Sequence, residues 1–418
     1  MISLLFLAFL FRTALSFGPF HPDLGNHLDW GIKFWTLGPK YFYENLFWQV
    51  SWPNQPPGTI YTFALIRKIY EAIFGLTWWL NIKIPSFPST LIPFFENKLY
   101  VALVKLPSIL ADLGIGLLIY KFVKELKNSK VAKIAATVFL VNPVIWYNSA
   151  VWGQTDALIN FFGLWSLYLF WKKKPILAAI VFLSSFYFKG SLLIFLPIIL
   201  ILLAKSETAW WKKVIVVLIF PVVLAYLSFP FVRWMSPIPW LYHLYVDRIF
   251  GHQGNMLTAN AFNLWALFFG IDFSVNDLGS FLGLTFKSWG QILFMVISAP
   301  VLVALLVKKF KIESVLFSLS AIAVFSFLFL TNMHERYLYP AIPCLTILIF
   351  IVPKMKFFYA LLCTAFMLNL YNLWFVPDPF GVKVFFTPSL VRVFSLFNLF
   401  LLVWFLWIFL RFFRPKKI

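Results

Sequence analysis

The chain has 418 residues, of which 62% are hydrophobic and 12% are charged. Soluble domains contain roughly 45–50% apolar and about 25% charged residues, so this composition excludes a soluble enzyme and indicates a polytopic membrane protein. The 35 Lys and Arg residues against 15 Asp and Glu residues give a formal net charge of +20. In a membrane protein such an excess first reports on which side of the bilayer the charges lie, so it does not predict nucleic-acid binding.

Apolar runs recur along the whole chain at about the length that a helix needs to cross a bilayer, which is about 20 residues. We therefore predict an all-α fold, a polytopic membrane helical bundle that forms a single domain over 1–418. The twelve predicted spans are 2–18, 100–120, 134–151, 154–171, 175–188, 191–204, 214–232, 289–307, 313–331, 336–352, 357–376 and 391–410.

Basic clusters fall on alternate connections between these spans, and the positive-inside rule makes those connections cytoplasmic. The clusters hold 20 of the 35 Lys and Arg residues, but only 3 of the 15 acids, Glu125, Glu207 and Glu313, lie in or beside them. They lie at 121–133, 172–174, 205–213, 308–311, 354–356 and 411–417. The same rule predicts two long outer loops, 19–98 and 233–287, of which the Pro-rich first should carry interfacial helices. A carboxylate that does chemistry is therefore expected to face outward.

The first outer loop begins with His21-Pro-Asp23-Leu-Gly-Asn-His27-Leu-Asp29. A carboxylate held at the membrane surface can act as a general base on an acceptor hydroxyl, which makes Asp23 and Asp29 candidates. A solvated loop acid or a helix cap is the alternative interpretation. The spacing of His21, Asp23 and His27 is not a recognised metal signature, so we expect no metal and no cofactor.

Two further outer positions combine polar and aromatic residues. Trp152, Gln154 and Asp156 at the start of one helix could stack on and hydrogen-bond a sugar, or form an interfacial Trp followed by a capping Asp. Lys189, at the tip of a short predicted hairpin, could bind an anionic lipid phosphate or extend to the outer surface.

The most concentrated ionisable sequence is Asn332-Met-His334-Glu335-Arg336, between two apolar runs. His334 and Arg336 could bind a phosphate while Glu335 orients them. Within the second predicted span, Asp112 lies two helical turns after Lys105, and the simplest interpretation is that these two form an intramembrane pair.

In this order the motifs resemble those of the GT-C superfamily of membrane glycosyltransferases. The nearest relatives by resemblance are the dolichyl-phosphate-glucose-dependent glucosyltransferases of N-glycan assembly, the mannosyltransferases of the GPI anchor and their bacterial counterparts. Asn54 stands where the family has an acid, and Arg336 where it has a lysine. The motifs that carry the resemblance are Asp23 with Trp30, Gln55-Pro-Pro-Gly58, Ser108 to Asp112, Phe186-Tyr-Phe188-Lys189, Asn260-Ala-Phe-Asn263 and His334-Glu335-Arg336.

The resemblance implies an inverting transfer of mannose or glucose from a polyprenyl-phosphate sugar to a lipid-linked or surface glycan. Asp23 would be the general base, and His334, Arg336 and Lys189 would hold the donor phosphate. Further candidates for binding the sugar or the acceptor are Asp29, Trp152, Gln154, Asp156, Asn260, Asn263 and Glu335.

The expected partners are the lipid-linked donor, the glycan acceptor and membrane lipids, without nucleic acid. The expected location is a bacterial or archaeal plasma membrane, or the endoplasmic reticulum membrane in a eukaryote, with the active site on the outer face. Two alternatives stay open. One is a lipid or glycan transporter or flippase, although the sequence shows none of the internal symmetry that is common in transporters. The other is a ligase that uses an undecaprenyl-diphosphate glycan.

Overall fold

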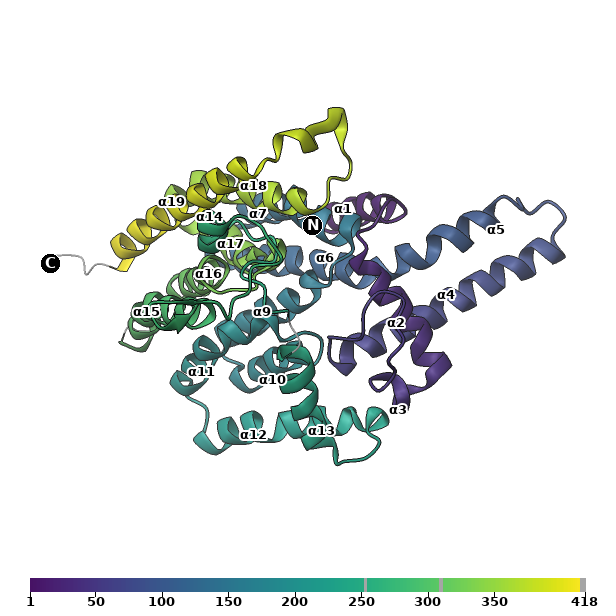
Figure 1. Cartoon of the computed structure of the whole chain (residues 1–418), viewed down its shortest axis with the longest axis horizontal. Helices are drawn as coiled ribbons and strands as arrows, with labels where there is room; N and C mark the ends of the chain where they lie inside the picture. The colour runs from purple at the N-terminus through teal and green to yellow at the C-terminus, as the bar shows by residue number, and fades with distance from the viewer. Residues whose placement is uncertain (252–253, 308–310, 414–418) are drawn as a thin grey trace.

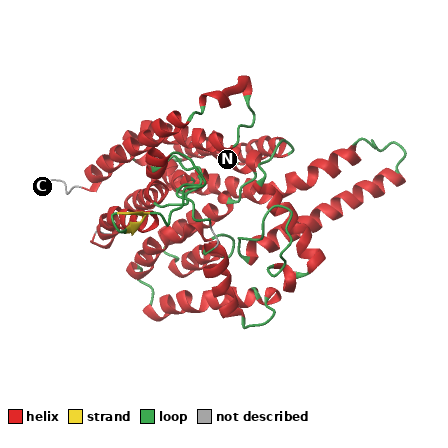
Figure 2. Cartoon of the chain, in the orientation of Figure 1, coloured by secondary structure: helices red, strands yellow, loops and turns green. Residues whose placement is uncertain are grey.

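A computed structural model describes residues 1–251, 254–307 and 311–413. Nearly all of its regular structure is helical (Figures 1 and 2), which fits the predicted all-α class. Within the described residues the one sheet is a short antiparallel pair, β1 (Ser280–Phe281) and β2 (Leu284–Thr285). Five residues of the predicted basic clusters lie outside the described part: Lys308, Lys309, Arg414, Lys416 and Lys417.

The N-terminal helices include the predicted first outer loop. They are α1 (Ile2–Ser16), α2 (Asp23–Leu37), α3 (Pro39–Phe42), α4 (Pro57–Lys83), α5 (Leu91–Phe94), the π-helix η1 (Phe95–Leu99) and α6 (Tyr100–Leu126). Pro57 stands at the first position of α4, where its fixed φ and missing N–H are tolerated. Helix α2 packs on α4, and α4 with α5 forms a hairpin that projects from the other helices in Figure 1.

The central helices follow α6 in the chain. They are α7 (Ser129–Leu140), α8 (Pro143–Trp146), η2 (Tyr147–Trp152), α9 (Asp156–Trp171), α10 (Pro175–Phe186), η3 (Gly190–Phe195), α11 (Leu196–Lys205), α12 (Trp210–Leu227) and η4 (Phe229–Phe231). Among them, α7 and α9 pack on α6, while α10 packs on α9. Asparagine side chains begin two of them, because Asn128 and Asn142 accept hydrogen bonds from the free backbone N–H groups of Val131 and Val144.

The C-terminal part contributes the most deeply buried helix. Its elements are α13 (Pro237–His243), η5 (Leu244–Phe250), α14 (Leu264–Phe269), α15 (Phe286–Val307), α16 (Ile312–Phe329), η6 (Glu335–Leu338), α17 (Ala341–Ile351), η7 (Pro353–Met355), α18 (Lys356–Leu373), η8 (Pro379–Phe385) and α19 (Pro388–Phe413). The apolar window of α16 is 89% buried, whereas those of α12 and α15 are 17% and 22% buried. Helix α16 is therefore core, and α12 and α15 present apolar surface of the kind that faces lipid.

Every predicted span coincides with helix, but the helices differ in length. Within the described residues, five are long and apolar enough to cross a membrane, or six if α7 and α8–η2, which are bent by 49° at their junction, count as one span. The five are 91–126, 210–227, 286–307, 312–329 and 388–412. The structure thus supports a helical membrane protein, and the count of twelve spans stays a prediction.

The predicted pair of Asp112 with Lys105 is wrong. Asp112 Oδ2 instead lies 3.3 Å from Nε of Arg12, which α1 brings against α6. Lys105 Nζ donates to the carbonyl oxygen of Pro19 at 2.9 Å. The cationic partner of Asp112 therefore comes from a helix 100 residues away in the sequence.

Arg12 and Asp112 form the centre of a sealed polar cluster, which we name the Arg12–Asp112 cluster. Ser149 Oγ and the hydroxyl of Tyr339 donate to the two oxygens of Asp112, at 2.5 and 2.8 Å. Arg12 Nη2 donates to the carbonyl oxygen of Leu140 at 2.8 Å. Both charged side chains are fully buried, and the hydrogen bonds offset part of the desolvation that burial costs.

Candidate functional site

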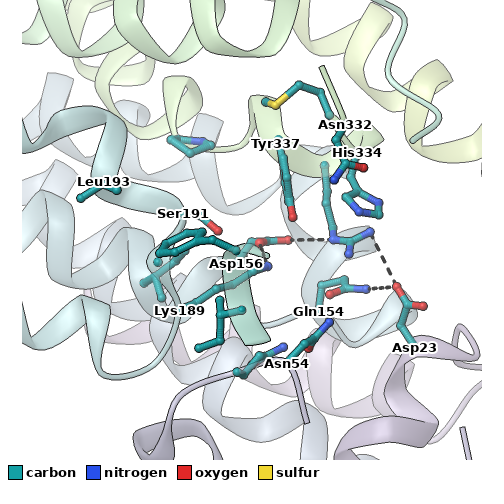
Figure 3. A pocket seen from close by; sticks show the side chains of 18 of the residues that line it. Asp23, Asn54, Gln154, Asp156, Lys189, Ser191, Leu193, Asn332, His334 and Tyr337 are labelled. Atoms are coloured by element: carbon teal, nitrogen blue, oxygen red, sulfur yellow. Dashed lines mark hydrogen bonds and ion pairs between the residues drawn. The ribbon is translucent and has the colours of Figure 1, made fainter. Parts of the chain in front are cut away.

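A polar cavity of about 540 Å³ lies where α2, the start of α9, η3 and the residues before α17 meet. Six of the residues predicted from the sequence line it, and Figure 3 shows five of them by label. They are Asp23, Gln154, Asp156, Lys189, His334 and Arg336. The structure therefore brings the predicted base and the predicted phosphate-binding residues into one space.

A tight turn places Asp23 beside Gln154. Gly153 has φ +93°, and a Cβ there would lie 2.7 Å from Cδ1 of Leu24, so a glycine lets α2 approach this turn. The backbone N–H of His21 donates to the carbonyl oxygen of Trp152 at 3.2 Å. Gln154 Nε2 then donates to Oδ2 of Asp23 at 2.8 Å (Figure 3).

The Pro-Pro-Gly turn packs against the Phe-x-Phe-Lys segment. Gly58 N–H donates to the carbonyl oxygen of Tyr187 at 2.9 Å, and Thr59 Oγ1 donates to that of Phe188 at 2.6 Å. A Cβ on Gly58 would lie 2.5 Å from the Tyr187 oxygen, so this contact requires glycine. Two motifs that the sequence presents separately thus hold Lys189 at the cavity, and no sequence signal predicts their contact.

The segment before His334 is held by the backbone of 259–261. The N–H groups of Ala259 and Ala261 donate to the carbonyl oxygen of Met333 at 3.1 and 3.2 Å. Asn260 adopts φ +74° between them, and its Oδ1 accepts from Nδ2 of Asn372 at 2.8 Å. Asn260, a predicted sugar-binding candidate, does not line the cavity and instead positions His334.

Four other predicted candidates also lie outside the cavity lining. Asn263 Oδ1 caps α14 by accepting from the N–H groups of Trp265 and Ala266. Asp29 is buried, where its Oδ2 accepts from the N–H of Gln49 at 3.1 Å. Glu335 is fully buried and accepts from Arg336 at 2.6 Å. These three side chains support the walls of the site.

Trp152 is the fourth of these candidates. Its side chain is fully buried and packs against the ring of His21, with 4.5 Å between ring centroids. It therefore has no free face on which a sugar could stack, and it contributes to the turn that carries Gln154.

The cations in the cavity are paired with carboxylates. Lys189 Nζ lies 2.8 Å from Oδ1 of Asp156, so this ammonium group is paired with a carboxylate and does not extend into solvent. Arg336 is shared, because Nη1 lies 2.6 Å from Glu335 and 3.6 Å from Asp23, while Nε lies 3.8 Å from Asp156. An anion that enters must therefore compete with carboxylates for these cations.

Burial and charge set the protonation of the two groups that keep open surface toward the cavity, Asp23 at 39% and His334 at 32% side-chain exposure. Burial raises the pKa of Asp23, but the contact with His21 and the charge of Arg336 outweigh it and hold this pKa well below its usual range. Burial and the nearby Arg336 lower the pKa of His334, so its ring is neutral at pH 7. His334 can thus offer a hydrogen bond to a ligand but no charge.

The neutral polar wall of the cavity was not predicted. It consists of Asn26, His27, Ser51, Asn54 and Gln55. Predicting a helix from Asp23 onward would have identified part of this wall. Asn26 and His27 lie three and four residues after Asp23 and therefore on the same face of α2.

An apolar groove of about 370 Å³ adjoins the polar cavity. The two share Gly190, Leu193 and Phe250 in their walls. The groove is lined mainly by side chains of α10, α12, α13 and η5. A polar and an apolar surface therefore meet at η3.

Within 1–251, 254–307 and 311–413, no three His, Cys, Asp or Glu side chains are grouped so that they could hold a metal ion. Neither the models of known protein families nor the curated protein sequences contain a match to this chain. The interpretation of the cavity therefore depends on its own residues and on the surfaces around it.

Proposed function

We propose that the chain is an inverting glycosyltransferase that moves a hexose, mannose or glucose, from a polyprenyl-phosphate sugar to a lipid-linked or surface glycan. The observation that carries the proposal is the junction of the polar cavity with the apolar groove at Gly190, Leu193 and Phe250. A lipid-linked sugar needs both surfaces, one for the sugar phosphate and one for the polyprenyl chain.

The proposed topology is the twelve-span bundle with the cavity on the outer face of a cell membrane. The basic connections described above would then be cytoplasmic, as the positive-inside rule requires. In the predicted topology, Asp23 lies in the first outer loop and Lys189 and His334 lie between spans, all on the side opposite the basic connections. This arrangement fits a donor and an acceptor that meet on the outer leaflet.

In the proposed reaction, Asp23 takes the proton of the acceptor hydroxyl. The acceptor oxygen forms a bond to the anomeric carbon from the face opposite the phosphate, and the bond between this carbon and the phosphate oxygen breaks. Polyprenyl phosphate leaves with the bonding electrons. A base works best when its pKa lies near the working pH, so Asp23 is a poor base while the contact with His21 and the charge of Arg336 hold its pKa low.

Binding of the donor would raise the pKa of Asp23. The donor phosphate would draw Arg336 away from Asp23, 3.6 Å from Nη1, and so raise the basicity of the carboxylate. Lys189 and the neutral His334 ring would complete the contacts with the phosphate oxygens. Cations fixed beside a leaving phosphate stabilise charge that grows in the transition state, an effect often worth about 3 kcal/mol per contact.

The test uses the full chain in lipid nanodiscs with radiolabelled undecaprenyl-phosphate mannose or undecaprenyl-phosphate glucose. The lipid extract of the native cells supplies acceptors. We expect label to move to a new product with release of undecaprenyl phosphate, and Asp23→Asn to reduce the rate by about 100-fold or more. Asp272→Asn is the matched control, because it makes the same change at an exposed acid outside the cavity and should leave the rate unchanged.

Three outcomes would contradict the proposal. Wild-type turnover by a folded Asp23→Asn variant would remove Asp23 as the base. Movement of a labelled lipid across the membrane without cleavage of its phosphate bond would indicate a flippase or transporter. Consumption of an undecaprenyl-diphosphate glycan in the absence of any monophosphate-linked sugar would indicate the ligase.

A further inference from the structure

The cavity has two chemically different walls. Charged side chains, Arg336, Lys189 and Asp156, gather on the wall formed by η6, η3 and α9. The wall formed by α2 and the turn at 51–55 carries amides, a hydroxyl and a ring that is neutral at pH 7. Asp23 belongs to both, since it lies on α2 and reaches Arg336.

We propose that the neutral wall is a binding subsite for the uncharged hexose ring of the donor, formed by Asn26, His27, Ser51, Asn54 and Gln55. This inference rests on the proposed function and adds to it which residues hold the sugar and which sugars they admit. The sequence motifs contain His27, Asn54 and Gln55, but they assign a sugar-binding role to none of the five side chains.

Two buried polar atoms in this wall lack partners. The His27 side chain is buried, with 3% of its surface exposed. Its ring nitrogen Nε2 lies 3.4 Å from Nε2 of the Gln55 amide. The other nitrogen, Nδ1, and Gln55 Oε1 make no hydrogen bond. Whichever way the Gln55 amide is turned, one polar atom on each residue stays unpaired. Each such atom costs about 1–3 kcal/mol, and a sugar hydroxyl, which both donates and accepts, can satisfy one of each kind.

The position of His27 is fixed by its neighbours. Its ring stacks on Phe63 with centroids 4.3 Å apart and planes inclined by 16°. Burial lowers the pKa of His27 to about 3, so the ring is uncharged at neutral pH. A rigid, uncharged polar group suits a ligand whose hydroxyls carry no formal charge.

Hydrogen bonds also fix the turn that faces His27. Trp30 Nε1 donates to the carbonyl oxygen of Ser51 at 3.1 Å, and Tyr43 OH donates to that of Gln55 at 2.7 Å. Ser51 Oγ donates to Oδ1 of Asn26 at 2.8 Å. The Nδ2 group of Asn26 is then the amide atom that remains available to a ligand. The subsite is thus built before any sugar arrives, which lowers the ordering cost of binding.

Apart from the Asp23 carboxylate, this wall carries no charge, and this composition defines the sugars that it admits. A hexuronate has the same ring as a hexose but carries a carboxylate at C6. In this subsite the carboxylate would lose water without gaining a cation, since Arg336 and Lys189 are on the other wall. The structure therefore assigns the subsite to neutral hexoses and excludes their uronic acids.

The experiment measures dissociation constants of the full chain in nanodiscs for four probes. They are bare undecaprenyl phosphate and the same lipid linked to glucose, mannose or glucuronate. We expect wild type to bind at least one hexose-linked probe about tenfold more tightly than the bare lipid, and we call this ratio of dissociation constants the hexose advantage. The glucuronate-linked probe should bind no more tightly than the bare lipid. His27→Phe, which keeps the stack on Phe63, and Gln55→Ala should reduce the hexose advantage to about twofold or less while binding of the bare lipid is unchanged.

Controls separate this inference from the proposed function. Gln49→Ala, at an exposed glutamine of the same loop outside the cavity, should retain the hexose advantage. Arg336→Gln should weaken binding of bare undecaprenyl phosphate without abolishing the hexose advantage, because it acts on the other wall.

The outcomes decide between the two proposals. If His27→Phe and Gln55→Ala both keep the full hexose advantage, or if glucuronate binds as tightly as glucose, the subsite assignment is overturned and the proposed function stands. If wild type binds none of the four probes more tightly than it binds an ordinary phospholipid, both proposals fail.

Discussion

Two clusters in this molecule each pair an arginine with an aspartate from a distant part of the chain, yet they differ in burial and in hydrogen bonding. In the Arg12–Asp112 cluster both side chains are fully buried, and both oxygens of Asp112 accept hydrogen bonds. In the cavity, Asp23 is 39% exposed and its contact with Arg336 is 3.6 Å long. Arg336 Nε there makes no hydrogen bond at all.

The difference separates an ion pair that is satisfied within the protein from one that lies at a cavity and keeps unpaired polar atoms. Charged side chains inside a membrane bundle are costly and therefore suggest function wherever they occur. In the Arg12–Asp112 cluster the two charged groups are fully buried and hydrogen-bonded by their neighbours. Residues that line the cavity keep buried polar atoms without a hydrogen-bond partner in the protein, and a ligand can supply such partners.

The largest expected effect is on stability, from Arg12→Met. Removing the cation leaves Asp112 buried without a charged partner, which should lower the free energy of unfolding by about 3–5 kcal/mol. Asp23→Asn should cost much less, because Asp23 is 39% exposed and Arg336 keeps its contact with Glu335 in this variant. Thermal unfolding of the three proteins in one detergent measures the difference.

The double variant Arg12→Met with Asp112→Asn is the control for this comparison. It removes both charges, so it should recover much of the stability that Arg12→Met loses. If Arg12→Met and Asp23→Asn shift the unfolding midpoint equally, burial does not explain the difference between the two clusters.

The sequence predicted the helical runs well, because their length and apolar composition are local properties. It also predicted site roles for Asp23, Gln154 and Arg336, and the structure places all three in the lining of one cavity. It gave the wrong partner for Asp112, since Lys105 lies on the same helix and Arg12 reaches it only through the packing of α1 on α6.

Other features of the site depend on tertiary contacts that a single sequence does not contain. The pairing of Lys189 with Asp156 requires that η3 and α9 meet, and the burial of Trp152 requires that His21 covers it. Asn263 shows the opposite case, because an asparagine that begins an apolar helix is a common capping pattern and can be recognised as such.

A smaller effect on stability should appear in acid and come from the cavity wall. The pKa of His27 is about 3 in the folded chain and about 6.5 in the unfolded chain. Below pH 6.5 the unfolded chain therefore binds a proton that the folded chain does not, so the free energy of unfolding falls as the pH falls. The loss from this residue should reach about 2 kcal/mol at pH 5.

His27→Phe removes that titration and tests the assignment. Unfolding of wild type and His27→Phe between pH 7.5 and pH 5 should show a shallower loss in the variant. The acid sensitivity that remains would include His334, whose pKa burial also lowers. Parallel pH profiles of wild type and variant would show that His27 is not held neutral by the fold.

The smallest effect is expected at an exposed ion pair on α4, in the projecting hairpin. Arg67 Nε lies 2.8 Å from Oε1 of Glu71, and Lys68 Nζ lies 2.7 Å from its other oxygen, but the Glu71 side chain is 37% exposed. Glu71→Gln should change the free energy of unfolding by less than about 1 kcal/mol, because water solvates both charges once the pair is lost. The Arg67 guanidinium keeps its contacts with the rings of Tyr70 and Tyr100 in this variant. A loss as large as that of Arg12→Met, measured in the same detergent, would mean that proximity of charges and not their burial sets the strength of ion pairs in this protein.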